Sequence, residues 1–401
     1  MQPPLLKQHG GKRERAWQGH PFFSGGFRPF FLFSSLFSII AVSLWLFELL
    51  GYDAINTPLA PVEWHKHEML FGYTSAVIAG FLFTAVPNWT GRLPVVGYRL
   101  MAIFALWLAG RVAMLLGETV PYAAAATIDA AFLPVLGGVI AREIISGQNW
   151  RNIKVLIPVL GLGLTNIWFH IDVSTGGTGA APVRMGFTAV LILLMLIGGR
   201  IVPSFTRNWL ARQEPGRMPV PFNRFDAVAV IGSAAALLLW VFLEKPFLGP
   251  VFAILGVLHS FRLWRWAGLR VISNPLLLVL HVFYAFIPAG FMTLAVGMWS
   301  DQPQINVAAL HVFGIGAIGG MTIAVMVRAS LGHTGRMLAS SSLLNLAMTM
   351  VGISMALRVV GAIWPDFDWA VTGSALAWII AFGLFAFRVG PWLLGPRVKA
   401  G

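Results

Sequence analysis

The sequence predicts an all-α polytopic membrane protein with twelve transmembrane helices. Of its 401 residues, 57% are hydrophobic and 11% are charged. Soluble domains average roughly 45–50% hydrophobic and about 25% charged residues. The mean hydropathy of +0.77 agrees with this prediction. The hydrophobic residues gather in segments of membrane-spanning length, and basic residues alternate between the connections. These observations exclude an ordinary soluble enzyme.

The expected helices follow from segment length, because about 20 apolar residues in a helix cross a bilayer core of roughly 30 Å. Such segments lie at 29–50, 65–86, 100–117, 122–141, 152–172, 183–203, 225–243, 247–267, 275–298, 305–328, 341–363 and 369–394. The first follows a basic stretch, as in a signal peptide, but it is too long and no small-residue cleavage site follows it. We therefore expect an anchored first helix.

The connections between these segments alternate in charge. The N-terminal tail, every second connection and the C-terminal tail, taken together with the helix ends that adjoin them, hold 22 of the 28 Lys and Arg residues. By the positive-inside rule, both termini are cytoplasmic and the number of helices is even. The net charge of +13 thus reflects topology and not nucleic-acid binding. We expect cytoplasmic tails at 1–26 and 396–401 around a transmembrane domain at 27–395.

The absence of cysteine narrows the possible chemistry. It excludes disulfides, iron–sulfur clusters, thiolate zinc and copper sites, a catalytic thiol and the C-x-x-C-H attachment of haem. Phosphate loops and nucleotide fingerprints are also absent, since Gly314-x-Gly316 lies inside a predicted span.

An internal repeat is indicated by three similar helix ends. These are VPNWTGR at 86–92, VPSFTR at 202–207 and LGHTGR at 331–336, offset by 116 and 128 residues. Each offset covers about four helices, so we expect three four-helix units of the same orientation. Chance similarity among basic helix ends is the alternative.

Seven of the nine histidines lie in or beside the predicted spans, namely His65, His67, His170, His259, His281, His311 and His333. The other two, His9 and His20, lie in the polar tail and have no expected role. Ionisable side chains within a membrane commonly mark functional sites. Imidazole is a frequent metal ligand, so we expect metal or haem ligation. Hydrogen bonding between helices is the alternative.

Helix depth divides these histidines into two groups. His67 and His311 each precede a Thr-Gly-Arg end by 25 residues, about 37 Å along a helix. We expect both to be direct ligands of a metal or haem site near the outer face, with His65 and His170 holding a neighbouring copper. On a regular helix, His65 and His67 point about 200° apart, so one metal would need an irregular start there. Glu68 is expected to accept an imidazole N–H, or else to stabilise a helix N-terminus.

The inner group contains His259 and His281, which each lie 11 residues from Arg270. Equal depth predicts that they share one ligand, and His333 lies nearer the cytoplasmic edge. The glycines that follow His311, at positions 314, 316, 319 and 320, leave room for a flat macrocycle or serve helix packing.

Several charged residues extend these predictions. Arg92, Arg262 and Arg336 are candidates to bind haem propionates, or are topology charges. Asp129 and Arg111, both inside spans, pair with each other or belong to a proton path.

The longest motif, HKHEMLFGY at 65–73, continues through residues 79–82 to AVPNWTG at 85–91. It resembles the signature of the NnrS family, as do FRPFF at 27–31, GRIVPSFTRN at 199–208, and the stretches 258–265 and 311–336. The resemblance covers about residues 25–395.

The resemblance to this family implies a haem- and copper-containing protein of the bacterial cytoplasmic membrane, associated with denitrification and nitric oxide tolerance. The resulting hypothesis is a protein in the lipid bilayer that binds or processes nitric oxide and protects against nitrosative stress. It would be either an oxidoreductase with a membrane or periplasmic electron donor, or a non-catalytic electron-transfer or sensing protein. The alternative is a secondary transporter of a metal ion or small molecule that uses intramembrane histidines.

Overall fold

The structure is a computed structural model that describes residues 17–57, 59–117, 119–300 and 302–398. Within these ranges every regular element is a helix, which confirms the all-α prediction. In chain order the elements are η1 (Pro21–Phe23), α2 (Phe27–Leu49), α3 (Pro61–His67), η2 (Glu68–Tyr73), α4 (Thr74–Thr90), α5 (Tyr98–Leu115), α6 (Tyr122–Ser146), η3 (Trp150–Asn152), α7 (Ile153–Ser174), α8 (Ala180–Leu210), α9 (Arg224–Phe242), α10 (Leu248–Trp264), η4 (Gly268–Val271), α11 (Pro275–Ser300), α12 (Pro303–His311), η5 (Val312–Gly319), α13 (Gly320–His333), α14 (Ser342–Ile363) and α15 (Asp368–Leu394).

Eleven of the described helical segments are long and apolar enough to cross a membrane. The remaining predicted segment, 247–267, corresponds to α10, which has only 17 residues. The protein is thus a multi-pass helical membrane protein, whereas the count of twelve spans stays a prediction. Several helices extend beyond the predicted spans; α8, for example, continues past Pro203 to Leu210.

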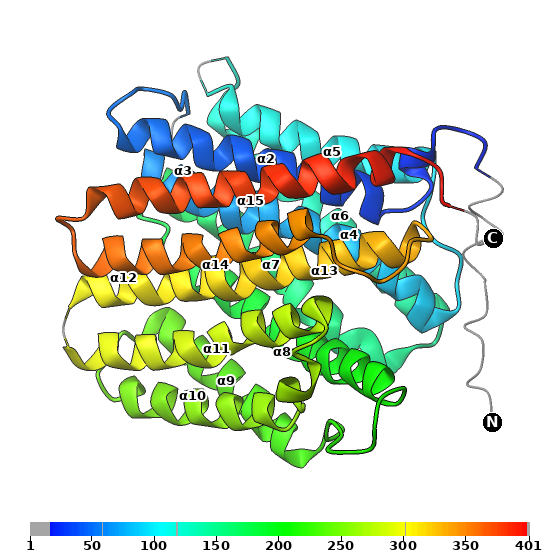
Figure 1. Cartoon of the computed structure of the whole chain (residues 1–401). Coiled ribbons are helices and arrows are strands. Elements are labelled where there is room, and N and C mark those ends of the chain that lie inside the picture. The colour runs from blue at the N-terminus through cyan, green and yellow to red at the C-terminus, as the bar shows by residue number, and fades with distance from the viewer. Residues whose placement is uncertain (1–16, 58, 118, 301, 399–401) are drawn as a thin grey trace.

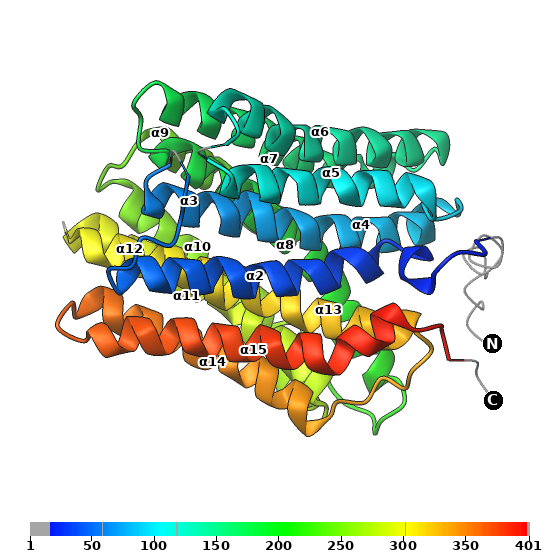
Figure 2. The same cartoon turned by 90° about the horizontal axis from the view of Figure 1, so that it is seen from above.

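The helices run side by side along one direction (Figures 1 and 2). The first and last described residues lie at the same end of the bundle, here called the terminal end, at the right of both views. There the Val398 N–H donates to the Thr334 carbonyl at 2.9 Å. The chain segments α3 and α12 begin at the opposite end, here called the far end. A cytoplasmic location of both tails stays a prediction.

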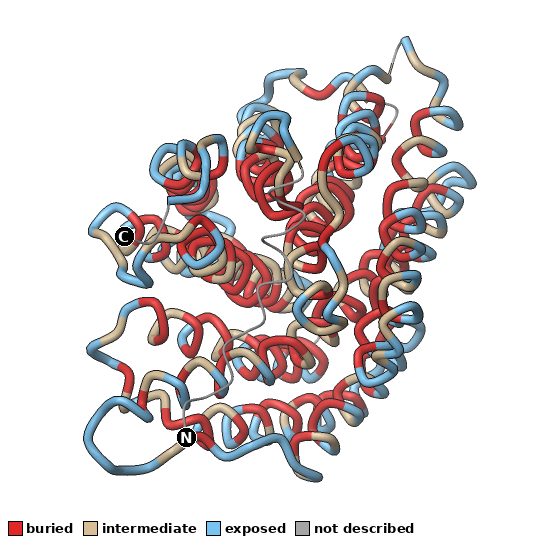
Figure 3. Tube along the Cα trace, turned by 90° about the vertical axis from the view of Figure 1, so that its right-hand side faces the viewer, coloured by how far each residue is buried: buried red, intermediate tan, exposed pale blue. Residues whose placement is uncertain are grey.

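Three segments form the interior of the bundle: α3 to α4, α8, and α12 to α13. In the most apolar windows of Pro61–Thr90 and Pro303–His333, 78% and 72% of the residues are buried. The helix α8 packs against both η2 and η5. Outer helices close around them through the pairs α15 with α2, α6 with α7, and α10 with α11. Figure 3, which looks along the bundle, shows exposed positions mainly on its outer surface.

Two inner segments share the same irregularity. The π-helical segments η2 and η5 begin directly after His67 and His311, the two residues that the repeat makes equivalent. Such π-helical turns are rare and frequently lie at functional sites. The matching positions therefore support the repeat, and they indicate that a functional site lies near the far end of the bundle.

The absence of native cysteine makes the topology directly testable. The side chains of Tyr52 and Tyr98 are 64% and 79% exposed and lie at the far and terminal ends. In intact cells, a membrane-impermeant thiol reagent should label Tyr52→Cys and spare Tyr98→Cys until the membrane is opened, because the terminal end carries the basic connections. Labelling of both variants in intact cells would contradict this orientation.

Candidate metal site

Three ligand-type side chains from three helices meet near the far end. His67 is the last residue of α3, Asp129 lies on α6 and His170 lies near the end of α7. All three are buried, and one potential ligand atom from each lies within 4.8 Å of the others. These residues form the His67–Asp129–His170 cluster.

The Oδ2 atom of Asp129 is the centre of the cluster. It lies 3.1 Å from His67 Nε2 and 2.9 Å from His170 Nε2. The side-chain amide of Asn166 donates to the same oxygen at 2.7 Å, and its Oδ1 lies 3.0 Å from His67 Nε2. Two imidazole nitrogens, a carboxylate oxygen and an amide oxygen thus converge in one buried place.

Partners on the far side of each imidazole orient the two rings. His67 Nδ1 lies 3.1 Å from Glu68 Oε1, and His170 Nδ1 lies 2.9 Å from the Tyr122 hydroxyl. These contacts turn both Nε2 atoms toward Asp129. A carboxylate behind a histidine is the usual arrangement for a metal-ligating imidazole. The expectation that Glu68 accepts an imidazole N–H is confirmed by this distance.

Arg111 on α5 connects the two acids. Its guanidinium makes short ion pairs with Glu68 and with Asp129 Oδ1, which confirms the predicted Asp129–Arg111 pair. Gly72 and Gly110 leave space for these groups. A Cβ atom on Gly72 would lie 2.5 Å from the Arg111 guanidinium, and one on Gly110 would lie 3.0 Å from the Asp129 Cα.

The charges of the cluster do not balance when both imidazoles are neutral. Glu68 and Asp129 bring two negative charges, and Arg111 brings one positive charge. An unbalanced charge is costly in a buried site, so one further positive charge is needed. A proton on His67 supplies it, because both ring nitrogens then donate to carboxylates. A metal cation held by the two Nε2 atoms and Asp129 would also compensate this charge; Cu⁺ would balance it, and a divalent ion would leave one positive charge in excess. This donor set suits Cu²⁺, Zn²⁺ or Fe²⁺.

The sequence analysis did not name two members of the site, although the spacing of each from a candidate ligand could have indicated it. Asn166 lies one helical turn before His170 on α7, and Tyr122 lies seven residues before Asp129 on α6. Residues at these spacings share a helix face. A search for polar residues on the same helix face as His170 and Asp129 would have identified Asn166 and Tyr122.

Of the four predicted outer histidines, His67 and His170 belong to the cluster, and the other two do not. The helix α3 is regular from Pro61 onward, so His65 and His67 point in different directions. The ring of His65 stacks on Trp45 at 4.7 Å, and its buried Nδ1 has no hydrogen-bond partner among the described residues. His65 interacts electrostatically with His311, and both interact with Arg358. His67 therefore lies beside His170, with ring centroids 4.9 Å apart, and a site shared by His67 and His311 stays a prediction.

The inner histidines have separate partners. His259 Nε2 lies 3.0 Å from the Ser233 hydroxyl, and its ring stacks on Phe291. His281 Nδ1 lies 3.0 Å from the Leu277 carbonyl, and its Nε2 lies 3.4 Å from Thr206. The shared ligand that equal depth predicted between His259 and His281 stays a prediction.

The remaining candidate residues contact protein groups. His333 packs against Phe27, with ring centroids 5.5 Å apart. Three arginines have partners: Arg92 pairs with Glu143, Arg262 pairs with Asp226, and Arg336 lies over the Trp392 ring.

The glycines after His311 are packed against aromatic rings. Cβ atoms on Gly316, Gly319 and Gly320 would lie within 2.7 Å of ring atoms of Phe286, Trp378 and Phe283. These side chains fill the room that we expected for a macrocycle, so the helix-packing alternative holds for these positions. Gly314 meets only ordinary contacts, at 3.6 Å.

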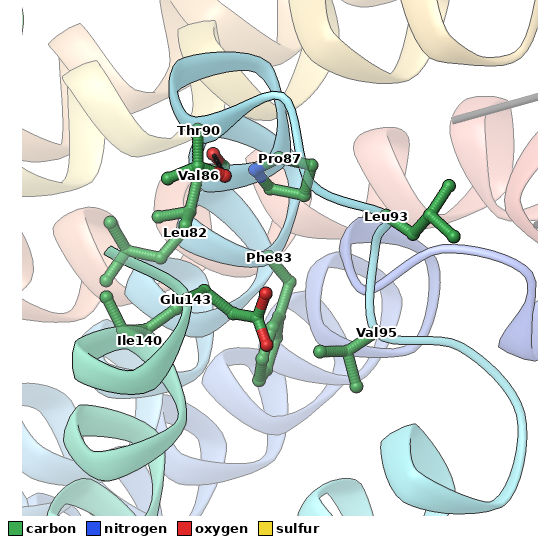
Figure 4. Close-up of a pocket in the computed structure, with 9 residues that line it drawn as sticks. All are labelled: Leu82, Phe83, Val86, Pro87, Thr90, Leu93, Val95, Ile140 and Glu143. Atoms are coloured by element: carbon green, nitrogen blue, oxygen red, sulfur yellow. Dashed lines mark hydrogen bonds between the residues drawn. The ribbon is translucent and has the colours of Figure 1, made fainter. Parts of the chain in front are cut away.

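Two apolar cavities lie outside the cluster. The smaller, near the terminal end, lies beside Pro87 on α4 and Ile140 on α6, with the Glu143 carboxylate at its rim (Figure 4). The larger, here called the central cavity, lies between α4, α8 and α13, and its lining contains no histidine.

The helical bundle and the buried cluster together define a multi-pass membrane protein with a candidate metal site. The chain belongs to the NnrS family: the family model described as NnrS protein matches residues 21–397, nearly the whole chain. This match confirms the resemblance found in the sequence. A comparison with curated proteins finds no match.

Arg111 is expected to be the most sensitive residue for stability. Arg111→Met leaves two buried carboxylates without their cation, which should lower the free energy of unfolding by about 3–5 kcal/mol. Arg92→Met is the matched control, since Arg92 pairs with Glu143 while its side chain is 37% exposed, and it should cost at most about 1 kcal/mol. Denaturation in detergent measures both, and equal losses would contradict the assigned role of Arg111.

Proposed function

We propose that this protein binds or processes nitric oxide at a buried metal centre and so protects a bacterium against nitrosative stress during denitrification. The observation that carries the proposal is the His67–Asp129–His170 cluster, whose uncompensated negative charge suits a bound cation. Membership of the NnrS family supports the same function. The proposed location is the cytoplasmic membrane, with an electron donor in the membrane or the periplasm.

Copper is the proposed ion of the cluster, with His67, His170 and Asp129 as its ligands. When bound, copper would supply a redox-active centre that accepts a small ligand such as nitric oxide. Glu68 and Tyr122 hold the two rings in place, and Arg111 keeps Asp129 ionised and oriented. With a metal held at Nε2, the remaining ring proton of His67 would lie on Nδ1, which faces Glu68.

Haem is proposed to be held by His65 on α3 and His311 on α12. Two features support this location. The Nδ1 atom of His65 is buried without a partner among the described residues, and His311 directs Nδ1 to the Val307 carbonyl at 2.8 Å, which leaves its Nε2 free to ligate. The guanidinium of Arg358 is close enough to interact with both rings and suits a haem carboxylate. Haem would supply an iron centre for gas binding or electron transfer.

The transporter alternative has less support. The central cavity is apolar and no histidine lines it, whereas a histidine-based transporter needs these residues along its substrate path.

The copper site is tested by Asp129→Asn and His170→Ala. Each should lower the copper content of the purified protein about tenfold or more, because direct ligands matter at least as much as their supporting partners. Asp226→Asn is the matched control, since Asp226 is also buried and paired with arginine, and it should retain copper. Full copper in both cluster variants would contradict the assignment.

Copper binding should also depend on pH. Because ligating imidazoles must be unprotonated at the ligand atom, protons compete with copper for the two Nε2 atoms, and copper affinity should fall as the pH is lowered. Titration of metal-free protein in weakly buffered solution should show proton release on copper addition. Binding without proton release would contradict this exchange.

The haem site is tested separately with His65→Ala and His311→Ala. Both variants should lose the haem Soret band and keep copper, because the two sites share no ligand. His20→Ala is the control, since His20 has no expected role and its Nδ1 accepts a hydrogen bond from the Phe22 N–H. An unchanged Soret band in both variants, or a purified protein that never binds haem, would contradict this location.

A further inference from the structure

The central cavity follows the internal repeat. Four residues of α4 that line it are Thr74, Val77, Ile78 and Phe81. The four residues 116 positions later, from Val190 to Ile197 on α8, also line it, as do the four a further 128 positions on, from Ile318 to Val325. These are the same two offsets that relate the three helix ends in the sequence. The cavity therefore lies where equivalent faces of the three units meet.

Contacts near the terminal end repeat in the same manner. The guanidinium of Arg200 lies over the Trp89 ring at 5.7 Å, and that of Arg328 lies over the Phe205 ring at 4.1 Å. Arg200 and Arg328 are 128 positions apart, and the two rings are 116 positions apart. Each arginine thus reaches the aromatic residue of the preceding unit. This second observation supports a threefold arrangement of the inner helices.

The chemistry of the lining is apolar throughout. Only Thr74 and Thr322 offer side-chain hydroxyls, and both are already hydrogen-bonded. Thr74 donates to the Met69 carbonyl at 2.8 Å, and Thr322 contacts the Gly319 carbonyl at 2.8 Å and the Tyr73 hydroxyl at 2.6 Å. A buried water needs two to four polar partners, whereas dry apolar cavities hold apolar molecules. The lining therefore favours an uncharged, apolar occupant.

The size and position of the cavity suit a small molecule. Its cavity volume is about 60 Å³. Thr74 and Ile318 are buried, whereas Phe81 and Val325, nearer the terminal end, are half-buried, so the cavity closes toward the far end.

We propose that the central cavity is a binding site for a small, uncharged, apolar molecule of the size class of diatomic gases. The inference depends only on the lining and not on the proposed function, although nitric oxide belongs to this chemical class. The inner end of the cavity is Thr74, the residue after the π-helical segment η2, which begins with Glu68, the partner of His67.

Xenon is the probe for this site, measured by ¹²⁹Xe NMR on the full chain in detergent without added metal. The wild-type protein should show saturable xenon binding. Leu193→Phe fills the cavity from α8 and should abolish it, whereas Ile231→Phe, at a position on α9 that is 68% exposed, should leave it unchanged. If Leu193→Phe does not fold, Val325→Phe fills the cavity from α13 and should have the same effect.

Three results would overturn the proposal. The first is xenon binding to the wild-type protein that rises in proportion to xenon concentration without saturating. The second is xenon binding to the filled variants that equals binding to the wild type. Native mass spectrometry could instead show a phospholipid that blocks xenon until it is removed, and the occupant would then be an acyl chain. Because no metal is added, failure here is distinct from failure of the copper or haem assignments.

Discussion

The far half of the bundle depends on one buried guanidinium shared by two carboxylates. Arg111 pairs with Glu68 and with Asp129, and it thereby joins η2, α5 and α6 through buried side chains. Buried ion pairs are stable only when every partner is present, so the positions of the acids, and of the histidines that face them, follow from this one contact. The contact also requires Gly72 and Gly110, because a side chain at either position would occupy the space of the paired groups.

A second buried ion cluster has the opposite charge balance. Asp226 pairs with both Arg262 and Arg265, which leaves one positive charge in excess. Arg262 acts electrostatically on the nearby His259, which makes this part of the bundle unfavourable for a cation. The two clusters thus explain why a histidine near Asp129 suits a metal ion, whereas a histidine near Arg262 has a hydroxyl as its partner.

The three units predicted from the sequence repeat share an inner face but differ in their polar residues. His67 and His311 are equivalent in the repeat and each precedes a π-helical segment, but the corresponding residue on α8 is Val183. Among the described residues, an acid, an arginine and a second histidine gather at His67. The apolar residues that line the central cavity are retained in all three units. The apolar interior therefore follows the repeat, whereas the residues of the candidate metal site differ between the predicted units.

The sequence alone determined the helices, their family and the concentration of histidines in the membrane, because apolar length and charge alternation are local properties of the chain. It also predicted the Asp129–Arg111 pair, since two opposite charges in hydrocarbon need each other. Only the tertiary structure decided that His67 meets His170 at Asp129. Spacing along a helix sets the depth of a side chain, whereas its direction depends on helix rotation. Helix packing and the π-helical segments determine that rotation, and no short sequence pattern predicts it.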